Sequence, residues 1–308
     1  MLESFVVTFS QVFVLFIFIA IGYILKKSGK LPENFSKGIS NLLVYIFMPF
    51  LTFRSMAGNF KLNIIGEKVS LIITSCILLG VFLILAFIFS RIFAKERLTR
   101  DIYVYSFTFP NSGYFGNPLV LAIFGEMMLF DYMIFCIPFL FLTYTFGVYI
   151  LNPERKINFK SLLNPMLVAM LIGMLVGAAD IKLFSAIDTA VEMGANCMAP
   201  SAMILTGIVF ASNNFKSMVT NVKAYVACFI KMIIIPLIAV FIFIYSAIPE
   251  DVAVLMVIML TLPTGLNSIV FPEAYGGDSR TGAQFCFIST LTCLFIMPLM
   301  LSLYQNLH

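Results

Sequence analysis

The chain has 308 residues, of which 61% are hydrophobic and 11% charged, and its formal net charge is +4. A soluble domain carries about 25% charged residues, so this composition excludes a water-soluble globule of this size. It indicates an integral membrane protein. The excess of positive charge is typical of cytoplasmic loops in such proteins, and we expect no nucleic-acid partner.

Segments of about 20 apolar residues are long enough to cross a bilayer as helices. The chain contains ten of them, joined by short connections, so the predicted fold is all-α with the lipid bilayer as its surroundings. The first segment follows the acidic start MLES and is too long for a signal peptide. The predicted spans are 5–25, 35–53, 68–90, 102–125, 129–151, 162–179, 185–211, 221–247, 252–275 and 281–304.

Chemistry-bearing residues are few. All six cysteines fall in apolar runs and the single histidine is the last residue. The cysteines are therefore interpreted as small buried hydrophobic residues, and we expect neither disulfide bonds nor a metal site. An intramembrane enzyme is a weak alternative, because the spans contain no histidine, no DxxxD pair and no GxSxG motif.

The polar stretch NPERKINFKS divides the ten spans into five and five, so an internal repeat would be inverted in the membrane. Prolines support such a repeat: Pro49 in span 2 matches Pro200 in span 7, and Pro110 in span 4 matches Pro263 in span 9. The predicted organisation is a first five-helix repeat at 1–151, a cytoplasmic linker at 152–161 and a second, inverted repeat at 162–308.

The prolines of spans 4 and 9 stand in stretches that disfavour a helix, FTFPNSG and LTLPTGL. Proline removes a backbone donor and clashes with the preceding turn. Each span is therefore predicted to consist of two half-helices that meet near the bilayer midplane, with a simple kink as the alternative. The second half-helices would direct their N-termini, each with roughly half a positive charge, at the centre. This arrangement favours an anionic substrate.

TFPNSGYFGNPLV at 108–120 resembles the proline-asparagine crossover of the auxin efflux carrier family, which includes the plant PIN-formed auxin transporters. LTLPTGLNSIVFPEAYGGD at 260–278 is similar to its partner segment. The resemblance implies crossing helices 4 and 9, scaffold and transport domains that each draw on both repeats, and elevator-type alternating access to a small organic anion. The short central loop favours a bacterial-type member. Oligomeric state is left open, with a homodimer as one alternative.

By this resemblance Asn111 corresponds to the crossover asparagine that supports a substrate carboxylate. Thr264 stands where plant members often have glutamine, and Phe139 is apolar where they place a polar contact. These departures argue against auxin itself. The resemblance to bacterial members of the family implies a mono- or dicarboxylate such as malonate or malate, with an auxin-like anion as the alternative. The predicted substrate-binding residues are Asn111, Ser112, Gly113, Asn117, Tyr144, Thr264, Gly265 and Asn267, and the predicted helix-break residues are Pro110 and Pro263.

Two charged residues lie within predicted spans. Glu192, about 10 Å deep in span 7, is a candidate for ion coupling or protonation, with a wet vestibule or a hydrogen bond to Asn196 as the alternative. For Lys231 we favour snorkelling to the cytoplasmic surface or a structural ion pair over substrate binding.

A sodium-coupled symporter of the bile-acid carrier type is a second hypothesis with the same fold. Asn111, Asn117, Thr264 and Asn267 would supply some of the oxygens that sodium needs. We expect no cofactor, and the coupling ion, Na⁺ or H⁺, stays open.

Fourteen Lys and Arg residues fall on one side of the predicted topology, and four, including Arg54 and Lys182, on the other. The richer side is predicted to be cytoplasmic. We therefore expect reporters at Glu3 and His308 to lie outside the cell membrane and one at Lys156 in the cytoplasm, as measured by labelling of intact cells. Termini on opposite sides would remove one span and contradict the inverted repeat.

Overall fold

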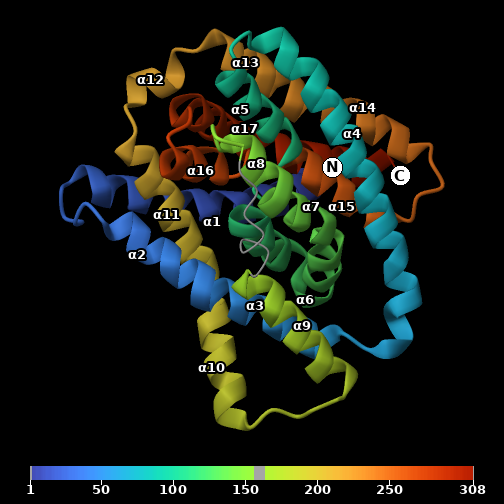
Figure 1. Cartoon of the computed structure of the whole chain (residues 1–308). Coiled ribbons are helices and arrows are strands. Elements are labelled where there is room, and N and C mark those ends of the chain that lie inside the picture. Colours follow the sequence, from blue (N-terminus) through green and yellow to red (C-terminus); the bar gives the residue numbers. More distant parts are fainter. Residues whose placement is uncertain (1, 156–163, 308) are drawn as a thin grey trace.

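The computed structural model describes residues 2–155 and 164–307. Within these ranges the protein is built from helices, some interrupted by π-helical turns, and from one isolated β-bridge (Figure 1). Most of the predicted linker at 152–161 lies outside the described residues. The prediction of an all-α membrane protein is confirmed.

Seven helical segments among the described residues are long and apolar enough to cross a membrane. They are Ser4–Lys27, Phe35–Asn59, Lys68–Phe93, Ser112–Phe135, Ser185–Ser212, Val222–Ile244 and Ser279–Leu307. Two shorter apolar helical segments, Ile137–Leu151 and Pro165–Ala178, fall within predicted spans 5 and 6.

The individual α-helices follow the predicted spans in order. They are α1 (Leu2–Lys27), α2 (Phe35–Leu42), α3 (Met48–Asn59), α4 (Ile65–Phe93), α5 (Arg97–Thr108), α6 (Asn117–Phe135), α7 (Ile137–Leu142), α8 (Val148–Leu151), α9 (Pro165–Ala178), α10 (Ser185–Asn196), α11 (Met198–Ser212), α12 (Phe215–Val219), α13 (Val222–Phe229), α14 (Ile235–Ile244), α15 (Glu250–Thr261), α16 (Asn267–Tyr275) and α17 (Ser279–Leu307).

Several predicted spans are interrupted in ways that the apolar pattern did not indicate. Predicted span 7 is divided at Cys197 into α10 and α11. Within α6, Gly125 adopts φ 80° and ψ −171°, a conformation that is strained for residues with a side chain. The chain therefore turns at Gly125, which is the predicted end of span 4.

The helices pack in two groups. In the first, α1 packs on α11, and α3 packs on both α9 and α10. In the second, α17 contacts α5 and the helices α12 to α16, while α4 packs on α5, α6 and α7. The two groups meet where α1 contacts α17 and α6 (Figure 1). Each group draws helices from both halves of the chain.

Two glycines bring α9 close to α3. A Cβ atom on Gly173 would lie 2.8 Å from the Phe53 carbonyl oxygen, and one on Gly177 would lie 2.7 Å from the Phe60 carbonyl oxygen. This spacing is the GxxxG pattern, which lets the backbones of two membrane helices approach each other. After the ends of α3 and α9, the Lys61 ammonium lies 2.5 Å from the Asp180 carboxylate. Its hydrogen bond and charge lower the pKa of that exposed carboxyl group.

An ion pair connects the two groups at one end of the molecule. The Arg54 guanidinium of α3 lies 3.0 Å from the Glu126 carboxylate, which follows the Gly125 turn. Both side chains are partly exposed, so the pair contributes little to stability.

Candidate functional site

Both predicted helix breaks are present. Helices α5 and α15 are each 12 residues long and end at Thr108 and Thr261. After the breaks, the chain resumes as the π-helical turn Ser112–Gly116, continued by α6, and as α16. Pro110 and Pro263 occupy the non-helical residues in between, where a missing backbone donor costs no helical hydrogen bond.

The two breaks are joined to each other by their backbones. The Asn111 N–H donates to the Pro263 carbonyl at 2.7 Å, and the Gly265 N–H donates to the Phe109 carbonyl at 3.1 Å. Together they form an antiparallel bridge between Pro110 and Thr264. Each break thus supplies a partner for polar groups that the other leaves exposed, and the two broken helices cross at this bridge.

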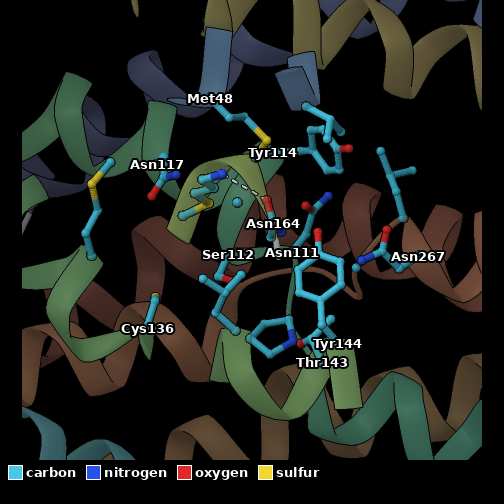
Figure 2. Close-up of a pocket in the computed structure, with 18 of the residues that line it drawn as sticks. Met48, Asn111, Ser112, Tyr114, Asn117, Cys136, Thr143, Tyr144, Asn164 and Asn267 are labelled. Atoms are coloured by element: carbon cyan, nitrogen blue, oxygen red, sulfur yellow. Dashed lines mark hydrogen bonds between the residues drawn. The ribbon is translucent and has the colours of Figure 1, made fainter. Parts of the chain in front are cut away.

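A cavity of about 70 Å³ lies beside the bridge. This is several times the roughly 10–15 Å³ that one water molecule needs, so the space suits a small polar molecule. Figure 2 shows polar side chains from both breaks around it. The predicted site residues that line the cavity are Pro110, Asn111, Ser112, Gly113, Asn117, Tyr144, Gly265 and Asn267.

Two asparagines give this cavity its polar character. Asn111 and Asn117 are 4% and 3% exposed. Among the described residues, neither side-chain amide has a hydrogen-bond partner. Buried amides normally find partners, so these groups are available to a molecule in the cavity.

Helix N-termini also converge here. Residues that line the cavity begin the helical segment at Ser112 and helix α16 at Asn267. Helix α9 begins there too, with Asn164 as its N-cap. The first N–H groups of a helix lack intrahelical acceptors and carry partial positive charge. The described residues of the cavity wall carry no charge, so the helix ends are what make this part of the wall electropositive.

Some cavity residues were not predicted from the sequence. Asn164, Tyr114 and Thr143 all line it. The Asn164 side chain accepts a hydrogen bond from the Met166 N–H at 2.9 Å. The Asn-Pro pair at 164–165 is a recognisable helix start. Its approach to the crossover depends on tertiary packing, which no local pattern indicates.

The structure places Thr264 outside the cavity lining, and its predicted direct contact with a substrate is corrected accordingly. Its hydroxyl donates to the Ser106 carbonyl at 3.1 Å, and its backbone N–H donates to the Ser289 hydroxyl at 3.0 Å. Successive side chains of extended backbone point to opposite sides. Gly265 faces the cavity, and Thr264 therefore faces away from it.

Lys231 also departs from its predicted position. It is 5% exposed, and its ammonium donates to the Thr264 hydroxyl at 3.0 Å. Snorkelling to the surface is therefore wrong. The long stem extends inward, from the π-helical turn Ile230–Ile234 to the back of the crossover.

Glu192 lies away from the cavity. Its side chain is 58% exposed and its carboxylate is 3.9 Å from the Arg54 guanidinium. Arg54 also donates to the Asn196 side chain at 3.4 Å, so Asn196 bonds to Arg54 and not to Glu192.

A family model described as Membrane transport protein matches residues 7–301. The chain belongs to this family. Its crossed, broken helices agree with the resemblance to auxin efflux carriers, and it is a multi-pass membrane protein.

Two curated relatives in this comparison are each similar to part of the chain. An uncharacterized transporter of Methanocaldococcus jannaschii is 32% identical over 162 residues, which cover 50% of this chain and 51% of the relative. An uncharacterized transporter of Schizosaccharomyces pombe is 30% identical over 106 residues, which cover 34% of this chain and 23% of the relative. The chain thus matches about half or less of these relatives, and their names indicate membrane transport.

The hydrogen bond from the Thr264 N–H to the Ser289 hydroxyl can be tested by mutation. Ser289→Ala leaves a buried backbone N–H without an acceptor, at a cost of about 1–3 kcal/mol. Ser302→Ala is the matched control, because Ser302 is equally buried on α17 and its hydroxyl donates to the Leu299 carbonyl of its own helix. In detergent, the melting temperature of Ser289→Ala should be clearly lower than that of Ser302→Ala. Equal melting temperatures would show that this hydrogen bond does not stabilise the crossover.

Proposed function

We propose that this protein is a secondary transporter of a small organic anion that binds in the crossover cavity. One observation carries the proposal: Asn111 and Asn117, two buried amides without hydrogen-bond partners among the described residues, line a cavity at which helices begin. Side-chain amides and helix N-termini both donate hydrogen bonds, and such donors are strongest toward an anionic acceptor.

The size and composition of the cavity narrow the class of substrate. A space of about 70 Å³ suits a mono- or dicarboxylate of a few carbon atoms, such as malonate or malate. Tyr144 and Met48 provide apolar surface beside the amides. The substrate is thus a compact carboxylate with a short hydrocarbon portion.

The cavity wall combines both packing groups. Val44, Met48 and Asn164 come from the group that contains α3 and α9, and the crossover residues come from the group that contains α5 and α17. We infer that the first group is the scaffold domain and the second the transport domain. Displacement of the transport domain along the scaffold carries the crossover from one membrane face to the other, which is elevator-type alternating access.

The proposed setting is the cell membrane with both termini outside, in accordance with the distribution of basic residues. In this orientation the Arg54–Glu126 pair lies at the outer end of the boundary between the domains.

Substrate charge tests the proposal directly. We expect malonate, malate or both to raise the melting temperature of the purified protein in a concentration-dependent way, because a ligand that binds only the folded state stabilises it. The uncharged diamides of the same acids should have little effect. An equal response to acids and amides would contradict an anion site, and no response to any small carboxylate in binding or in vesicle uptake would overturn the function.

The asparagine of the first break is the most informative single residue. Asn111→Ala should weaken carboxylate binding by about 1–3 kcal/mol, the usual value for loss of a hydrogen bond to a charged group. The fold should persist, because the side chain has no partner within the described protein. Asn213→Ala is the control, since the Asn213 side chain donates to the Val209 carbonyl at the end of α11, away from the cavity. Binding by Asn111→Ala that equals the control would reject the site assignment.

A further inference from the structure

Lys231 lies behind the crossover, on the side away from the cavity. Its ammonium is 3.0 Å from the Thr264 hydroxyl and 5.8 Å from the centre of the Phe285 ring. Since the Thr264 hydroxyl donates to the Ser106 carbonyl, it accepts from Lys231. The ammonium is thus connected to the bridge through a single hydroxyl group.

This buried cation has no anionic partner in the described part of the chain. The ion pairs of the described residues involve Arg54, Lys61, Lys68 and Arg155, and none includes Lys231. Its neighbours are the thiols of Cys228, Cys286 and Cys293. A buried charge without a counter-ion is costly, and such residues in a membrane protein mark functional sites by default.

The position of Lys231 matches the polarity of the broken helices. Helices α5 and α15 end at the crossover, so their negative C-terminal ends converge there. The Ser106 carbonyl belongs to the last turn of α5, where carbonyls lack intrahelical donors. Lys231 and Thr264 supply hydrogen-bond donors and positive charge at these C-terminal helix ends. The cavity lies on the other side of the bridge, at the helix N-termini.

We propose that Lys231 is a built-in cation of the crossover, which raises the affinity of the cavity for anions and removes the need for bound sodium. This inference rests on the proposed function. Lys231 is a positioning residue that acts through Thr264 and through its electric field, without contact with the substrate. A mobile cation would have to compete with the tethered ammonium for the oxygens of Thr264 and Ser106.

The test uses Lys231→Met in the full-length protein. The probes are malonate or malate, whichever the wild type binds more tightly, and the monoamide of that acid, which carries one charge fewer. We expect dicarboxylate affinity to fall on the order of tenfold, as for loss of a nearby unit charge, and monoamide affinity to fall distinctly less. Wild-type binding should be equal in sodium chloride and choline chloride.

The variant should also unfold at the same temperature as the wild type or higher, because methionine replaces an uncompensated buried charge. Lys223→Met, which removes the same charge from the exposed start of α13, is the control and should bind like the wild type. A structural lysine would instead give a less stable variant that loses both ligands equally.

Three results overturn the inference while leaving the proposed function intact. They are wild-type affinity in Lys231→Met, equal losses for both ligands, and a sodium requirement in the wild type. A wild-type protein that binds no carboxylate in either salt would instead reject the proposed function, and the role of Lys231 with it.

Discussion

Backbone groups cannot remain unpaired in the interior of a membrane, and the crossover is how this chain meets that constraint. Each proline-containing break releases N–H and C=O groups from helical bonding, at a cost of several kcal/mol for each group left unsatisfied. The bonds from Asn111 to Pro263 and from Gly265 to Phe109 pair one break with the other. Neither break could exist in this form alone, so the two must lie at the same depth and in contact.

The bridge also creates two different environments on its two sides. Because it is extended, neighbouring side chains alternate between them. The cavity side contains Gly265 and the asparagines, at the positive ends of helices. The opposite side contains Thr264, Ser289 and Lys231, at the negative ends. A short stretch of strand-like pairing thus separates the proposed anion site from the buried ammonium of Lys231.

Much of this arrangement could be predicted from local chemistry. The apolar lengths indicated the spans, and proline beside Asn-Ser-Gly or Thr-Gly indicated where helices stop, because those residues destabilise a helix wherever they stand. The matched breaks further indicated that two distant segments meet. Most of the cavity residues follow from these facts, since residues beside a break must line whatever space the break creates.

The side on which a residue lies could not be predicted in the same way. Thr264 is one residue from Gly265, and a shift of one residue in the bridge would exchange their directions. The position of Lys231 in the sequence is the same whether its side chain extends outward or inward. The inward direction is favoured by the buried Thr264 hydroxyl, which comes from a distant part of the chain. Asn164 reaches the cavity because α9 packs on α3, through glycines distant from the site.

These properties together bear on how the proposed transport would proceed. The bridge bonds are internal to the group that contains α5, α15 and α17, so movement of that group past α3 and α9 need not break them. Among the described residues, the part of the cavity wall that changes is the one formed by Val44, Met48, Asn164 and Met166. On this mechanism the amides and the buried lysine travel with the substrate, and its charge stays compensated throughout the passage. The scaffold then controls access, while the crossover itself determines which anion is accepted.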